Sequence, residues 1–190
     1  MDHYTVEEKQ VGPFTVETWL DQDAGQFENP AQDFWDQGVQ FVTWERNSTL
    51  SDLHSWEDKE AVVRIAEKDG CTVFSLYKYE HGAVAYKTSP FSCPWDSGQV
   101  GFVIVAADYD DPQNVAEACC KAVTGWCNGE YYGFSVKDED DEILECCGGF
   151  DDSDWALAEG VDQANYCLEE YYEKQAKELE ATRPDLYEVA

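Results

Sequence analysis

The chain has 190 residues, of which 41 are acidic and 12 basic, and a formal net charge of −29. Hydrophobic residues make up 43% and aromatic residues 14%, so the charge does not indicate disorder, which also requires low hydrophobicity. A surface this negative repels nucleic acid and anionic membranes and attracts basic partners. We therefore expect a folded protein that binds neither nucleic acid nor membrane directly.

The eight cysteines are the next guide to the class of protein. The first ten residues lack the basic start and apolar run of a signal peptide, so we expect reduced thiols and a cytoplasmic protein. The longest apolar stretch, roughly residues 100–107, is far shorter than the ~20 residues that span a bilayer.

Two strands and a helix are predicted in the first third of the chain. Apolar and polar residues alternate over 14–20 and 39–44, which predicts half-buried strands, with a loop or short helix over 25–38. Ser55 is expected to cap a helix that Gly70 ends. The apolar face of this helix comprises Ala61, Val62, Ile65 and Ala66.

The middle of the chain reads as a hairpin, a loop and a buried strand. Residues 72–79 and 83–88 flank Gly82, which predicts a hairpin with glycine in its turn. The Pro-containing loop 89–98 then leads into residues 99–105, which are apolar enough for a central strand.

A helix follows this strand. Asp110 or Asp111 is expected to cap it, with Pro112 near its first turn, and the helix is expected to run through about Trp126.

The last third predicts a second hairpin and a long helix. The hairpin joins 130–137 to 142–147 through residues 138–141, and the helix begins at Ser153 or Asp154 and fades near Pro184. The apolar face of that helix comprises Trp155, Leu157, Ala158, Val161, Ala164, Leu168, Tyr171 and Tyr172.

Together these elements predict an α+β fold, a mostly antiparallel sheet with helices packed on one face and a long C-terminal helix. We expect a single acidic domain over residues 1–182 and a tail over residues 183–190.

The acidic residues are not spread evenly. The 36 residues from 138 to 173 contain 14 acids and no lysine or arginine, and a second base-free stretch runs from 10 to 45. The primary candidate partner-binding residues are Asp138, Glu139, Asp140, Asp141, Glu142, Glu145, Asp151, Asp152, Asp154, Glu159, Asp162, Glu169 and Glu170. The secondary candidates are Asp21, Asp23, Glu28, Asp33 and Asp36.

Carboxylates held on a rigid scaffold can occupy the basic groove in which an enzyme neutralises DNA phosphates with lysine and arginine. The sequence therefore favours a DNA-mimicking inhibitor of a host defence enzyme, a restriction or CRISPR complex, that binds stoichiometrically to a basic DNA- or RNA-binding surface. A merely solvated acidic face and halophilic adaptation of the source organism stay open as alternatives. The oligomeric state is also open, with a homodimer among the possibilities.

Catalytic and metal motifs are weak. The acidic runs lack the glycine of a calcium loop, and Cys119-Cys120 and Cys146-Cys147 are adjacent pairs rather than zinc knuckles. Cys93 with His54 or His81 as base is the best nucleophile candidate, and no recognised signature surrounds it. Since phosphate-binding glycine loops are also absent from the sequence, we expect no enzyme activity, cofactor or metal, apart from weak nonspecific binding of divalent ions.

Three segments carry a family resemblance. The segments Thr88–Phe102 (TSPFSCPWDSGQVGF), Asn128–Phe134 (NGEYYGF) and Cys146–Phe150 (CCGGF) resemble a family of acidic proteins of unassigned activity from phages and conjugative elements. The similarity covers roughly residues 70–170 and supplies no catalytic residues. Such elements also carry antirestriction DNA mimics of the ArdA type, which this chain resembles in charge and size only. The resemblance implies anti-defence activity, in the host cytoplasm if the protein is phage-encoded.

The first of these segments supports a second hypothesis. Phe91 and Trp95 are expected to anchor the loop, and Gly98 and Gly101 to allow close backbone approach at the start of the strand. The same loop could instead be an interaction surface. The alternative function is then a regulatory module that binds a basic protein without mimicking DNA.

Overall fold

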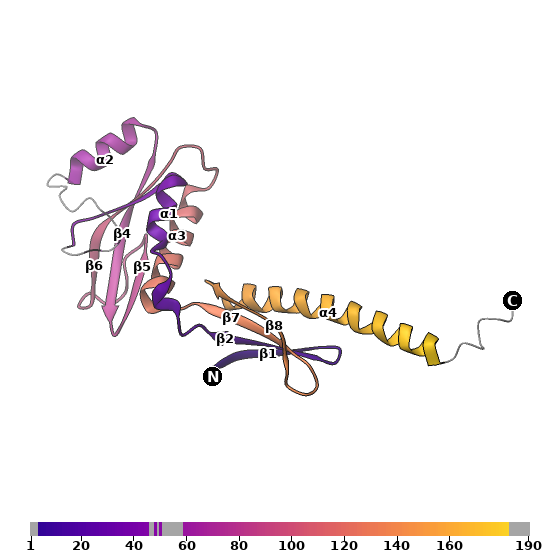
Figure 1. The fold of residues 1–190 in the computed structure, drawn as a ribbon. Coiled ribbons are helices and arrows are strands. Elements are labelled where there is room, and N and C mark those ends of the chain that lie inside the picture. Colours follow the sequence, from indigo (N-terminus) through magenta and orange to yellow (C-terminus); the bar gives the residue numbers. More distant parts are fainter. Residues whose placement is uncertain (1–3, 46–47, 49, 51–58, 183–190) are drawn as a thin grey trace. The chain divides into compact units, whose positions relative to one another are not determined.

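Our structure is a computed structural model, shown in Figure 1. It describes residues 4–45, 48, 50 and 59–182. The predicted α+β class, with antiparallel sheets and a long C-terminal helix, is confirmed. No helix within the described ranges combines the length and apolar character needed to cross a membrane.

Contacts between residues divide the chain into two compact units, each with its own four-stranded sheet. The terminal unit comprises residues 1–22 and 130–190, and the central unit comprises residues 23–129. The strands thus form two sheets where the sequence analysis expected one. The single domain over residues 1–182 stays a prediction, because the division shows where contacts gather and not whether the units fold together.

The sheet of the terminal unit has the strand order β1-β2-β7-β8, with every pair antiparallel. β2 pairs with β7 along its length, for example Val16 with Val136, so segments from both ends of the sequence share one sheet. The helix α4 follows β8. The bounds are β1 Thr5–Val11, β2 Phe14–Leu20, β7 Tyr132–Lys137, β8 Ile143–Phe150 and α4 Ser153–Thr182.

One face of this sheet packs against α4 through small residues spaced four apart. Ala156, Gly160 and Ala164 are the buried residues of the helix. A methyl group added at Gly160 would lie 2.7 Å from Val16 Cγ1 and 3.0 Å from the Phe134 ring. The helix backbone therefore lies unusually close to the sheet, and the buried cluster contains Phe14, Val16, Phe134, Val136, Phe150, Ala156 and Ala164.

The predicted start of α4 is confirmed, since the helix begins at Ser153, whereas its apolar face differs from the sequence expectation. Asp152 caps the helix, because its carboxylate accepts the Asp154 N–H at 3.0 Å and the Trp155 N–H at 3.1 Å. Trp155, Ala158 and Tyr172 are exposed. The periodicity favoured large apolar residues, whereas the sheet admits only small ones where the helix comes closest.

The strand β1 was not predicted from the sequence. Residues 5–10 are all exposed, and Glu7, Glu8 and Lys9 leave no apolar alternation to detect. β1 lies at the edge of the sheet, where charged side chains discourage pairing with other chains.

The central unit has the strand order β3-β6-β4-β5, again antiparallel throughout. β6 pairs with both β3 and β4, which confirms the predicted central strand, and Gly82 at φ +79° forms the predicted turn between β4 and β5. The bounds are β3 Val39–Thr43, β4 Thr72–His81, β5 Ala83–Lys87 and β6 Ser97–Val105.

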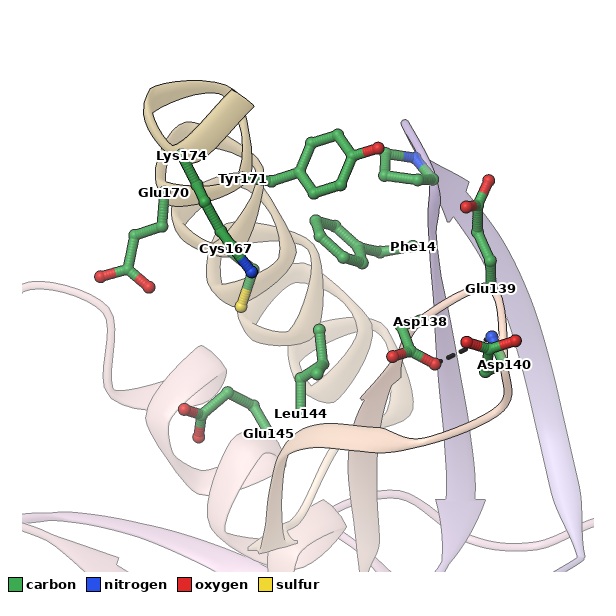
Figure 2. A pocket seen from close by; sticks show the side chains of 11 residues that line it. Phe14, Asp138, Glu139, Asp140, Leu144, Glu145, Cys167, Glu170, Tyr171 and Lys174 are labelled. Carbon is green, nitrogen blue, oxygen red and sulfur yellow. Dashed lines mark hydrogen bonds between the residues drawn. The ribbon is translucent and has the colours of Figure 1, made fainter. Parts of the chain in front are cut away.

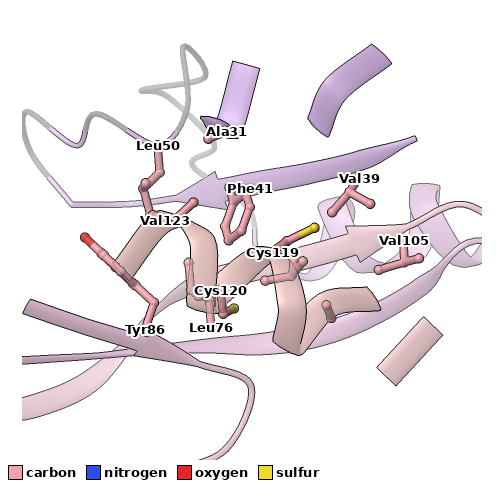
Figure 3. Packing of buried hydrophobic residues seen from close by; sticks show 12 residues of the cluster. Ala31, Val39, Phe41, Leu50, Leu76, Tyr86, Val105, Cys119, Cys120 and Val123 are labelled. Carbon is pink, nitrogen blue, oxygen red and sulfur yellow. The ribbon is translucent and has the colours of Figure 1, made fainter. Parts of the chain in front are cut away.

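Helices cover both faces of the central sheet, whereas α4 covers one face of the terminal sheet. On one face α1 and α3 bury the cluster of Figure 3, which includes Phe41, Leu76 and Val123. On the other face α2 buries Val62 and Ala66 against β3 and β6. The helices are η1 Ala24–Gln26 (a short 3-10 turn), α1 Pro30–Asp36, α2 Lys59–Lys68 and α3 Pro112–Asn128.

The helix ends follow the sequence signals in part. Asp111 caps α3 as predicted, accepting the Asn114 N–H at 3.1 Å, and Gly129 ends this helix at φ +67°. In α2, Ile65 is 51% exposed, so its predicted place on the apolar face was wrong. The predicted cap Ser55 lies outside the described residues.

Side chains of α3 cover the outer edge of β5. The Asn128 amide donates to the Val84 carbonyl at 2.8 Å and accepts the Val84 N–H at 2.9 Å. Thr124 Oγ1 accepts the Tyr86 N–H at 2.8 Å. These bonds satisfy backbone groups that a neighbouring strand would otherwise pair.

Two glycines of β6 play different parts. A methyl group at Gly101 would lie 2.1 Å from the Val42 carbonyl oxygen, so the β3 and β6 backbones approach there as predicted. A methyl group at Gly98 would meet nothing within 4 Å, so the close approach expected at Gly98 was wrong.

This difference predicts the effect of a matched pair of substitutions. Gly101→Ala should lower the free energy of unfolding of the central unit by about 1–3 kcal/mol, because the Val42 carbonyl belongs to the backbone and has to move. Gly98→Ala should change it by less than about 0.5 kcal/mol. Urea unfolding measures both, and equal losses would contradict the register of β3 on β6.

Candidate protein-binding surface

All thirteen primary acidic candidates lie in the terminal unit, and ten of them are exposed. They occupy four places along its chain. Asp138, Glu139, Asp140, Asp141 and Glu142 form the turn between β7 and β8, and Glu145 lies on β8; Asp151, Asp152 and Asp154 surround the start of α4, and Glu159, Asp162, Glu169 and Glu170 follow along that helix.

The secondary candidates do not share one unit. Asp21 follows β2 in the terminal unit, whereas Asp23, Glu28, Asp33 and Asp36 belong to the central unit. The second base-free stretch is therefore continuous in sequence and divided in structure.

The turn between β7 and β8 is held by Asp138. One oxygen of its carboxylate accepts the N–H groups of Asp140 and Glu142, both at 2.9 Å. The Asp138 and Glu142 backbones also bond to each other at 3.0 Å, and Asp141 adopts φ +63°. The neighbouring carboxylates of the turn are thus displayed on an ordered backbone. Asp138 here, like Asp152 at the start of α4, has a structural task of its own.

A groove of about 520 Å³ lies between this turn, β8 and α4, and we call it the acidic groove (Figure 2). Its apolar surface comes from Phe14, Leu144 and Tyr171, on β2, β8 and α4. The Phe14 and Tyr171 rings meet edge to face with centroids 5.9 Å apart. The carboxylates around this apolar floor are Asp138, Glu139, Asp140, Glu145 and Glu170.

Sequence reasoning found the five carboxylates of the groove but not its apolar floor. Leu144 stays 41% exposed although it neighbours Phe14 and Tyr171 in the groove. Strand alternation could not have found Leu144, because alternation places Leu144 and Glu145 on opposite faces of β8. The register of β7 on β8 shifts at this point, and both residues line the groove.

Few bases offset the acids of the terminal unit. It has 24 acidic and 5 basic side chains in 83 residues, against 17 and 7 in the 107 residues of the central unit. Lys137 is bound to Glu17 of β2 at 2.6 Å, and Lys177 lies 3.6 Å from Glu173. Lys174 lines the acidic groove itself.

The pKa values of the groups beside these acids show the local negative field. Burial raises the pKa of the Cys167 thiol in the groove, and Glu145 and Glu170 raise it further. A hydrogen bond to Glu170 is the main cause of the raised pKa of the exposed Tyr166 phenol. Both groups therefore stay protonated and neutral near pH 7, so Cys167 is a poor nucleophile.

The loop around Cys93 is tied at several points. The Phe91 ring lies 5.6 Å from the Tyr79 ring, with the Lys87 ammonium 4.2 Å from its centroid. Ser97 donates to the Cys93 carbonyl. Trp95 is 91% exposed, so Phe91 anchors the loop and the expected anchoring role of Trp95 was wrong.

In the part of the chain that the structure describes, the Cys93 thiol is hydrogen-bonded to a carboxylate and not to the candidate base His81. The thiol donates to Asp96 Oδ2 at 3.3 Å, and His81 Nδ1 lies 3.6 Å from that same oxygen. The second candidate base, His54, lies outside the described residues.

The adjacent cysteine pairs lie in different environments. Cys119 and Cys120 are buried in the central unit, where burial raises the pKa of Cys119 to about 11, whereas Cys146 and Cys147 are exposed on β8. Within the part of the chain that the structure describes, no three His, Cys, Asp or Glu side chains are grouped to hold a metal ion.

Comparisons with protein-family models, with curated proteins and with solved structures gave no match. The resemblance of the Thr88–Phe102 segment to acidic proteins of mobile elements therefore stays a prediction.

Proposed function

We propose that the protein is a DNA-mimicking inhibitor of a host defence enzyme, a restriction or CRISPR complex, and that it binds that enzyme's basic DNA-binding surface stoichiometrically and without catalysis. The observation that carries this proposal is the gathering of carboxylates on the β7–β8 turn, on β8 and along α4 of one unit. Lysine and arginine are absent from residues 138–173 of that surface.

The spacing of the charges decides how such a mimic acts. Between Asp154 and Glu173, α4 rises about 30 Å at ~1.5 Å per residue and carries six acids, so it presents one charge per ~5 Å. Duplex DNA carries one per ~1.7 Å. The helix alone therefore has about a third of the charge density of DNA, and the turn and Asp151 have to supply the rest.

The scaffold holds these charges in place. α4 packs on the sheet from Ala156 to Tyr171, and the Asp138 bonds close the turn. A preformed arrangement of charges loses little conformational entropy on binding. Carboxylates also offer no phosphodiester bond to cleave, so the protein can compete with DNA without being consumed.

A second candidate function rests on Trp95. A tryptophan that is 91% exposed on a loop tied by Phe91 and Ser97 has the properties of a binding hot spot, since tryptophan is enriched there. The alternative is a regulatory module that binds a basic protein through this loop, with little dependence on charge.

A DNA competition assay tests the first proposal. The protein should displace DNA from a restriction or CRISPR complex of its host at low salt, and the displacement should weaken as salt screens the carboxylates. Failure to displace DNA from any of these complexes at low salt would contradict DNA mimicry.

Two matched variants separate the surface from the net charge. The first variant replaces four exposed acids of the terminal unit by lysine: Glu139→Lys, Asp140→Lys, Asp151→Lys and Glu169→Lys. It should weaken inhibition by about a hundredfold or more, because the interaction of each site with the basic partner changes from attraction to repulsion. The control variant changes the net charge by the same amount on exposed sites of the central unit: Glu67→Lys, Asp69→Lys, Asp108→Lys and Asp110→Lys. It should weaken inhibition far less than the first variant. Equal losses would show that bulk charge, and not the terminal surface, drives binding. Asp138 and Asp152 are left intact because they hold the backbone.

The variant Trp95→Ala tests the second candidate. If the loop binds the target, this substitution should lower affinity by about thirtyfold or more, an effect that salt changes little. Trp35→Ala is the control, since Trp35 is 51% exposed in the same unit. Unchanged affinity of Trp95→Ala in a binding assay with the target would exclude the loop.

A further inference from the structure

We propose that the acidic groove binds an arginine side chain of the partner together with the apolar residue beside it. This inference rests on the proposed function, because it names the chemistry of the basic segment that one part of the acidic surface accepts.

The groove combines carboxylates with an apolar floor. Phe14, Leu144 and Tyr171 come from three different elements and face the same space (Figure 2). Leu144 is 41% exposed, so a side chain entering the groove would remove apolar surface from water. An acidic surface that is only solvated needs no such floor. A purely ionic contact with the charged head groups of the partner's lysine and arginine residues would not use the floor either.

The charges around the floor select a cation. Asp138, Glu145 and Glu170 come from three separate elements of the groove, and Asp138 is fixed by its bonds to the turn. The described residues hold no group arranged for a metal ion. The charge complement of this groove is therefore an organic cation of the partner.

Arginine fits this combination better than lysine does. Its guanidinium is planar and weakly hydrated, it stacks on aromatic rings, and it binds carboxylates with two parallel hydrogen bonds. The partly exposed Tyr171 ring, which packs against the buried Phe14 ring, offers such a stacking surface, and the alkyl stem of the arginine can cover Leu144. The residue beside the arginine in the partner then meets the remaining apolar surface.

Lys174 allows the electrostatic contribution to binding in the groove to be tested within the chain itself. It lines the groove together with Glu170, one helical turn before it, and supplies a cation of the chain itself. A cation in the same space opposes a second one. Its removal should therefore strengthen binding of the partner's arginine.

The test is a titration of the full chain at low salt with a blocked five-residue peptide that has arginine at its centre and leucine on either side. NMR shifts of the labelled protein report the site and the affinity. We expect shifts at Leu144, Glu145 and Tyr171, and at least about tenfold weaker binding when neutral citrulline replaces the arginine, since a charged contact is lost. Lysine at that position should bind more weakly than arginine.

Neighbouring residues on β8 supply the controls. Leu144→Asn should weaken peptide binding by about fivefold. Ile143→Asn should not weaken it, because Ile143, the exposed residue that precedes Leu144, does not line the groove. Glu145→Gln should weaken binding more than Glu142→Gln. Lys174→Gln should strengthen binding by about threefold, whereas the same change at Lys177, which lies beside Glu173, should have a smaller effect.

The outcomes separate this inference from the proposed function. Absence of saturable peptide binding, equal effects of Leu144→Asn and Ile143→Asn, or equal binding of the citrulline peptide would overturn the groove inference. Displacement of DNA by a Leu144→Asn variant with wild-type potency would overturn the groove's part in inhibition while DNA mimicry stands. A peptide that binds the groove of a chain unable to displace DNA from any complex would overturn the proposed function and leave the groove as an arginine site.

Discussion

The close contact between α4 and the terminal sheet is the constraint on which the acidic surface depends. At Gly160 the helix lies so near β2 and β7 that even a methyl group would collide with Val16 and Phe134. This contact sets the height of α4 above the sheet and so the width of the acidic groove beside Phe14. The carboxylates of the helix, of β8 and of the turn take their mutual positions from the same packing.

The terminal unit folds against its own charge. Its 24 acidic side chains far outnumber its 5 basic ones and repel one another, and self-repulsion destabilises a compact state. The buried cluster of the sheet and α4, the Asp138 turn and the Asp152 cap oppose this repulsion. A unit that keeps so unfavourable a surface carries it at a cost in stability.

Local sequence signals predicted most elements, and long-range packing accounts for the failures. The alternation of apolar and polar residues predicted β2, the apolar run predicted the central strand β6, and Asp111 predicted the start of α3. Each of these signals depends only on residues that are neighbours in sequence. β1 was missed because its exposed residues carry no alternation. The anchoring role expected of Trp95 and the close approach expected at Gly98 depend on partners far away in the chain, as does the apolar floor of the groove. The acidic residues were found from sequence, but their division between two units, and the structural tasks of Asp138 and Asp152, required the fold.

Hydrogen exchange on the complex between the protein and its target tests the central claim most directly. DNA mimicry predicts that slowed exchange in this protein falls on the β7–β8 turn, on β8 and on α4 up to Glu173. It also predicts that slowed exchange in the target coincides with the footprint of DNA. Protection confined to the loop around Trp95, or a target footprint away from the DNA-binding surface, would contradict it.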